Sequence, residues 1–143
     1  MNHRLPSFWP LVALAVPLAL TGCGQQESGP WVTFDGGGFV VNYSGGYGAA
    51  FYGFNAKPLR RLPAGTVLEA SFEDPAGGPP IIDKQQVTEP ALRYSFRTPY
   101  LHGIVAHHPY KAEVHVLEAG TGKLLGSYQT NFVSQVDDAW LQK

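Results

Sequence analysis

Hydrophobic and polar residues alternate along several stretches of the chain. Within residues 67–73, Leu68, Ala70 and Phe72 occupy one set of alternate positions, and the other set holds the polar residues Glu69, Ser71 and Glu73. A period of two is typical of a β-strand that turns one face to the core and the other to solvent. The same alternation predicts strands over residues 91–97, 110–116 and 124–132.

Segments rich in glycine and proline separate these strands. They lie at residues 36–38, 62–65, 74–80 and 107–109, and such clusters are typical of turns. Apolar runs between them predict further strands over residues 31–35, 39–43, 49–55 and 81–88. The glycine-bearing segment 119–123 predicts a hairpin between the last two strands. Only residues 136–142 suggest a helix.

Seven to eight short strands at this spacing predict an all-β fold. The favoured architecture is an antiparallel β-sandwich of immunoglobulin-like type, formed by a single domain over residues 31–143. A small barrel is the alternative. Glu69 and Glu73 share one polar strand face, and Arg93 and Arg97 share another. If the two strands are neighbours, these residues form cross-strand ion pairs on a solvated sheet face.

An uncharged apolar stretch at residues 8–20 follows a weakly positive start that contains His3 and Arg4. The stretch is shorter than the roughly 20 helical residues needed to cross a membrane. Pro10 and Pro17 would also disturb a long helix. A positive start, a short apolar core and small residues after it are typical of a secretory signal peptide.

This stretch ends in Leu20-Thr21-Gly22-Cys23. The four residues resemble the lipobox of bacterial lipoproteins, in which an aliphatic residue and two small residues precede a cysteine. The resemblance implies transfer of diacylglycerol to the Cys23 sulfur, cleavage before Cys23 and acylation of its new amine. It also implies sorting to the outer membrane, with the domain facing the periplasm, because Gly24 rather than aspartate follows. An ordinary cleaved signal peptide and an uncleaved anchor are the alternatives.

The resemblance divides the chain into a signal peptide over residues 1–22, a lipidated cysteine with its tether over residues 23–30, and the folded domain. Residues 24–30 are polar and unpatterned. They span at most about 25 Å when fully extended, so the domain is expected to lie close to the membrane surface.

Composition excludes several classes of protein. The chain has 143 residues and a formal net charge of −1, so it lacks the basic excess that nucleic-acid binding requires. Its single cysteine cannot form an internal disulfide or a thiolate zinc site. Aromatic residues make up 13% of the chain, which favours a packed domain over a disordered one.

Residues 36–55 are unusually rich in glycine and aromatic residues. Tyr43, Tyr47, Tyr52 and Phe54 are the candidate partner-binding residues, because aromatic rings supply a large and rigid contact area. The alternative is that the segment forms two core strands joined by glycine-rich turns. Alternation places Tyr52 and Phe54 on the same face as Ala50, as a core would require. Tyr47 is the tyrosine of this segment least suited to a core.

Nothing in the spacing of reactive residues indicates catalysis, and we predict no catalytic residue. His107 and His108 are adjacent and would face opposite ways on a strand, although a loop would suit them better. His102 and His115 are possible third ligands, but nothing in the sequence fixes their distance, and the chain has no HxH or HExxH spacing. We therefore expect neither a metal site nor a cofactor.

Residues 62–74 carry a second resemblance to a known family. They are similar to a strand of small β-sandwich lipoproteins related to type III secretion pilotins, in which a Leu-Pro-x-Gly turn opens a strand that ends near an aspartate. The resemblance implies a sandwich and assigns no partner-binding residue.

The prediction for function is a non-enzymatic envelope lipoprotein. It would be anchored in the membrane through Cys23 and would bind or chaperone another envelope component, a protein partner in the first instance. A glycan- or peptide-binding module that uses residues 36–55 is the alternative. An envelope hydrolase whose catalytic residues meet only in space is a third hypothesis.

Overall fold

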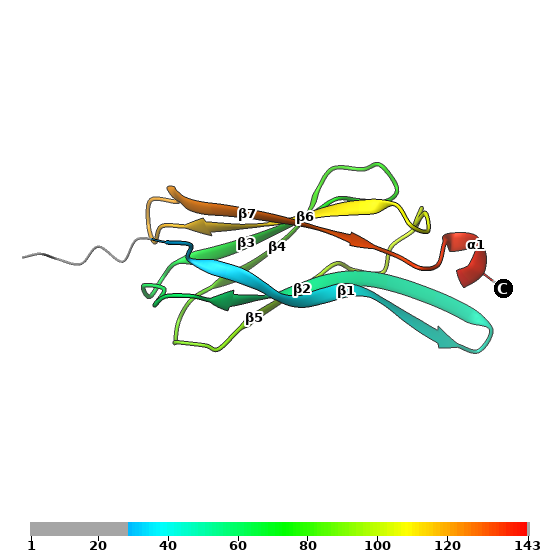
Figure 1. Cartoon of the computed structure of the whole chain (residues 1–143), viewed down its shortest axis with the longest axis horizontal. Coiled ribbons are helices and arrows are strands. Elements are labelled where there is room, and N and C mark those ends of the chain that lie inside the picture. Colours follow the sequence, from blue (N-terminus) through cyan, green and yellow to red (C-terminus); the bar gives the residue numbers. More distant parts are fainter. Residues whose placement is uncertain (1–28, 143) are drawn as a thin grey trace, which may run out of the picture.

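The computed structural model describes residues 29–142, which form two stacked antiparallel β-sheets and one short helix (Figure 1). Cys23 and the predicted signal peptide lie outside the described residues. The elements in chain order are β1 (Val32–Ser44), β2 (Tyr47–Pro58), β3 (Val67–Phe72), β4 (Ile81–Gln86), β5 (Tyr94–Arg97), β6 (Pro109–Leu117), β7 (Leu124–Val133) and α1 (Asp138–Leu141). No helix in the described range is long and apolar enough to cross a membrane.

The order of the strands confirms the predicted sandwich. One sheet has the order β1-β2-β5 and the other has the order β4-β3-β6-β7. This is the arrangement of an immunoglobulin-like domain whose fourth strand pairs with the third instead of the fifth. The predicted hairpin over residues 110–132 is also confirmed, since β6 and β7 pair in antiparallel fashion.

The core lies between the two sheets and follows the alternation of the sequence. In β3 the side chains of Leu68, Ala70 and Phe72 are fully buried, while the residues between them are partly exposed. In β2, Tyr52 and Phe54 meet Phe72 with ring centroids 5.2 and 5.3 Å away. These aromatic contacts join the two sheets at the centre of the domain.

The first strand differs from its prediction. Residues 31–35 and 39–43 were expected to be separate strands with a turn at the glycines, but β1 runs through both. The register with β2 shifts between Phe34 and Gly37, which marks a bulge rather than a turn. A side chain at Gly37 would collide with the Phe132 ring and with the backbone of Gly53. The glycine therefore allows close packing inside the sandwich.

The expected ion pairs between Glu69 or Glu73 and Arg93 or Arg97 do not form, because β3 and β5 belong to different sheets. The ammonium of Lys84, on β4, lies 2.8 Å from Glu69 instead. Strand β5 is also shorter than the predicted segment 91–97, and Leu92 is 90% exposed. Alternation over residues 91–93 thus does not reflect strand structure.

The β1–β2 hairpin extends well past the other strands and ends beside α1 (Figure 1). Strand β2 packs against α1 near its turn, where a side chain at Gly48 would collide with Leu141. The carboxylate of Asp138 accepts hydrogen bonds from the backbone N–H groups of Gly103 and Ile104. Helix α1 is thereby fixed to the loop before β6.

Candidate functional site

The four aromatic candidates of the segment 36–55 fall into two groups. Tyr52 is 0% exposed and Phe54 is 3% exposed, so both belong to the core and cannot contact a partner of the folded domain. Tyr43 is 52% exposed and Tyr47 is 79% exposed. Tyr43 contacts the ring of Trp140 with centroids 5.8 Å apart, and Tyr47 lies at the hairpin turn. Only Tyr43 and Tyr47 remain candidates for partner binding.

Tyr52 is a structural residue. Its ring stacks on Phe39 with centroids 4.7 Å apart, and its hydroxyl donates to the backbone carbonyl of Glu73 over 2.6 Å. Burial, followed by the negative charge of Glu73, raises the pKa of the Tyr52 phenol well above its usual value. The hydroxyl therefore stays protonated and acts as a buried hydrogen-bond donor.

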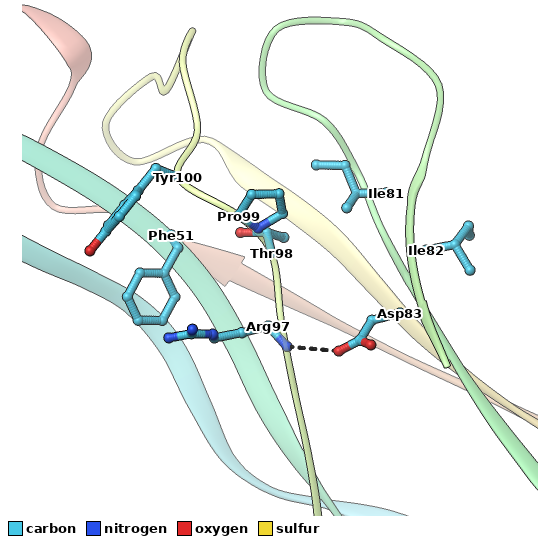
Figure 2. A pocket seen from close by; sticks show the side chains of 8 residues that line it. All are labelled: Phe51, Ile81, Ile82, Asp83, Arg97, Thr98, Pro99 and Tyr100. Carbon is cyan, nitrogen blue, oxygen red and sulfur yellow. Dashed lines mark hydrogen bonds between the residues drawn. The ribbon is translucent and has the colours of Figure 1, made fainter. Parts of the chain in front are cut away.

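A pocket of about 490 Å³ opens on the side of the sandwich where β2 and β5 approach β4 (Figure 2). Phe51, Arg97 and Tyr100 line one side of it. The side chains of Ile81 and Asp83, on β4, line the other, whereas the Ile82 side chain points away from Phe51 and Arg97. The pocket thus combines two aromatic rings, aliphatic surface and one residue of each charge.

Arg97 is the central residue of this pocket. Its guanidinium carbon lies 5.3 Å from the centroid of the Phe51 ring, and cations attract the faces of aromatic rings at such distances. The Asp83 carboxylate accepts a 3.4 Å hydrogen bond from the Arg97 backbone N–H, and the Arg97 side chain points away from it toward Phe51 (Figure 2). Within the described part of the chain Arg97 forms no ion pair, so its charge is accessible to a ligand.

A shallower groove of about 280 Å³ continues from the pocket across the outer face of the β1-β2-β5 sheet, and Phe51 and Arg97 line both. Gly38 and Gly53 are paired across β1 and β2, and both line the groove. Because neither has a side chain, the backbone itself forms the floor at this point. We call the pocket and the groove together the Phe51–Arg97 surface.

Polar groups are ordered beside the Phe51–Arg97 surface. The Asn42 amide donates to the Tyr100 hydroxyl over 3.0 Å, and the Ser95 hydroxyl donates to the Asn55 carbonyl over 2.6 Å. Hydrogen bonds between neighbours hold these side chains in fixed orientations.

Sequence reasoning identified the segment 36–55 but missed Phe51, Arg97 and Tyr100 as residues of this surface. Alternation did place Arg97 on a solvent face, which was the one indication available.

The histidines of the described domain lie in different surroundings. No group of three or more potential ligands is found among the described residues. His107 has a positive φ of 62° in the loop before β6, and His108 packs against the Tyr110 ring with centroids 4.7 Å apart. His115 lies instead on the outer face of the other sheet, between Glu69 and Glu113.

The surroundings of His115 form a network of charges. Lys84 lies 2.8 Å from Glu69, and Lys111 lies 2.9 Å from Glu113. Hydrogen bonding to Lys84 lowers the pKa of the Glu69 carboxyl, and hydrogen bonding to Lys111 lowers that of Glu113. Both carboxylates are about 20% exposed, so solvent screens these pairs in part.

Acid should weaken the fold through these two carboxylates. Their folded-state pKa values lie below the ordinary value of 4.5, so their contribution to stability is present above that value and is lost as pH falls through the folded pKa. Replacing both by glutamine should lower the free energy of unfolding at pH 7 by about 1 kcal/mol. Urea denaturation at pH 7 and pH 3 tests this: the difference between wild type and Glu69→Gln/Glu113→Gln should shrink at pH 3. An equal difference at both pH values would contradict it.

Comparison of the chain with models of protein families, with curated proteins and with solved structures finds no match.

Proposed function

We propose that this chain is a lipid-anchored lipoprotein of the bacterial outer membrane that binds or chaperones another component of the cell envelope without catalysis. The lipobox resemblance of Leu20-Thr21-Gly22-Cys23 supports the anchor and the address. The short segment 24–30 supports a position close to the membrane surface. A partner of this domain would therefore be met at or near the membrane.

The Phe51–Arg97 surface is the observation that best supports binding. An open pocket and a groove meet at an aromatic ring and at an arginine whose guanidinium forms no ion pair among the described residues. Aromatic residues and arginine are enriched where proteins bind one another. Ile81 on the opposite wall adds aliphatic contact area.

A second candidate function is binding of a glycan or a peptide on the same surface. It is favoured by the amides of Asn42 and Asn55, which lie beside the Phe51 ring and the glycine floor. A sugar can place an apolar face on the ring while its hydroxyls pair with amides. A peptide can lie along the exposed backbone between Gly38 and Gly53.

Photocrosslinking in intact cells tests the proposed function. A photoreactive amino acid at Tyr100, which lines the pocket and is 57% exposed, should give a reproducible adduct with another envelope protein. The matched control is Leu124, which is 55% exposed at the start of β7 and remote from the surface, and it should give none. Arg97→Ala should reduce the Tyr100 adduct severalfold while the melting temperature stays within a few degrees.

Three outcomes separate the candidates. A Tyr100-specific adduct supports a protein partner. Binding on a glycan array that Arg97→Ala abolishes, with no protein adduct, supports the second candidate. Equal adducts at Tyr100 and Leu124, together with no glycan binding, would contradict both candidates.

A further inference from the structure

The half of β1 nearest the hairpin turn is exposed on both faces. Val40 points to the outer face and is 44% exposed; Val41 and Tyr43 point to the inner face and are 36% and 52% exposed. Strand β1 is also an edge strand, since β2 is its one ladder partner among the described residues. Residues 40–44 therefore form an exposed, uncharged edge of a sheet.

The register shows which backbone groups are unpaired along this edge. Ser44 and Tyr47 flank the two-residue turn, and such flanking residues exchange hydrogen bonds. Because bonded and non-bonded pairs alternate, Val41 and Tyr43 belong to the non-bonded set, and their N–H and C=O groups point away from β2. In agreement, the carbonyl of Ala50, the residue paired with Val41, accepts a bond from Leu101 on the far side of β2.

The other sheet edges are protected, and this one is not. Side chains of β4 occupy the edge of β5, where Gln85 donates to the Ser95 carbonyl and Asp83 accepts from the Arg97 N–H. In the other sheet, the edge strand β4 is protected by its own charged residues, and the edge strand β7 is protected because it lies against β1. Natural proteins guard edges with charges, proline, short strands or covering segments, yet residues 40–44 have no charge, no proline and no covering strand.

We propose that this edge binds the same edge of a second copy of the chain, in antiparallel orientation about a two-fold axis at Val41. The β1-β2-β5 sheets of the two copies then form one continuous sheet through the dimer. Val41 pairs with Val41 of the second copy, and Phe39 pairs with Tyr43 across the axis. The backbone groups left free in the monomer pair with each other.

Self-complementarity is the reason to choose a second copy over a strand of another protein. A two-fold interface places a surface against itself, so a charged surface would repel its copy. Residues 39–44 contain no charged residue, and the antiparallel register brings aromatic residues to aromatic residues and valine to valine. This inference does not rest on the proposed function, because its argument uses the unpaired backbone groups of β1, although Phe39 and Val40 of this edge also line the groove.

Disulfide trapping in intact cells tests the register with the full chain. Paired residues of this kind have Cα atoms about 5.5 Å apart, a separation that a disulfide spans. Val41→Cys should form a covalent dimer on mild oxidation, well above the level of the unsubstituted chain, which contains only Cys23. The control Tyr47→Cys is more exposed, but its two copies would lie on the order of 20 Å apart along the strands and should form none.

Sedimentation velocity of the detergent-solubilised full chain provides the second measurement. The wild type and Tyr47→Lys should sediment as dimers, and Val41→Lys should sediment as a monomer because two ammonium groups would meet at the axis. Equal thermal unfolding of the two variants would show that Val41→Lys remains folded. A monomeric wild type, a dimeric Val41→Lys, equal trapping at Val41 and Tyr47, or trapping of Val41→Cys to a different protein would each overturn the proposal.

Discussion

Replacing Tyr52 by alanine is expected to lower the free energy of unfolding by about 3–5 kcal/mol, the usual cost of truncating a large buried aromatic residue. The side chain is 0% exposed, and its ring contacts both Phe39 of its own sheet and Phe72 of the opposite sheet. Truncation would leave a cavity between the sheets. It would also remove the hydroxyl that donates to the Glu73 carbonyl. Equilibrium denaturation in urea measures the change.

Two matched variants separate the parts of this effect. Tyr52→Phe keeps the ring and removes only the hydroxyl, and should cost about 1 kcal/mol. Tyr47→Ala removes the same kind of side chain from a site that is 79% exposed and should change stability by less than about 0.5 kcal/mol. Similar losses for Tyr47→Ala and Tyr52→Ala would show that position in the core does not govern the effect.

Replacing Cys23 by serine is expected to move the protein from the membrane fraction to the soluble periplasmic fraction. The lipobox resemblance places the acyl chains on this residue, and each buried methylene contributes about 0.8 kcal/mol to membrane binding. One acyl chain holds a protein only marginally, whereas several hold it firmly. Loss of the acceptor sulfur should therefore abolish anchoring. Fractionation of cells with and without the substitution measures the result.

The alternatives for the first residues of the chain give different outcomes. An uncleaved anchor would leave Cys23→Ser in the membrane fraction, and an ordinary cleaved signal peptide would leave even the wild type soluble. Mass spectrometry of the wild type should find the mass of a diacylated and N-acylated chain that begins at Cys23. Gly22→Ala retains a small residue before the cysteine and should keep the protein in the membrane, which makes it a suitable control.

Local alternation predicted the fold where one face of a strand is buried throughout. In β3 and β6 every inward position is apolar and every outward position is polar or only partly buried, so the sequence alone located both strands. Alternation failed at residues 91–93, where Leu92 is almost fully exposed. It also failed at the glycines of β1, because glycine is typical both of turns and of bulges.

The candidate site was predicted only in part, because its residues meet through tertiary structure. Alternation within the segment 36–55 separated core positions such as Tyr52 from turn positions such as Tyr47. It gave no indication that Arg97, more than 40 residues further along the chain, would approach Phe51. That contact depends on the pairing of β2 with β5, and such pairing leaves no local pattern.

The sequence by itself determined most of the strands, the all-β class and the expectation of a lipid anchor at Cys23, since each follows from short-range patterns of apolar, polar and small residues. Only the tertiary structure decided which strands are neighbours. It therefore placed Glu69 beside Lys84 instead of an arginine of β5, joined Phe51 to Arg97, and left the edge at Val41 unpaired. The physical reason is that pairing between strands depends on how whole sheets bury their apolar faces together, whereas a period of two depends on one strand alone.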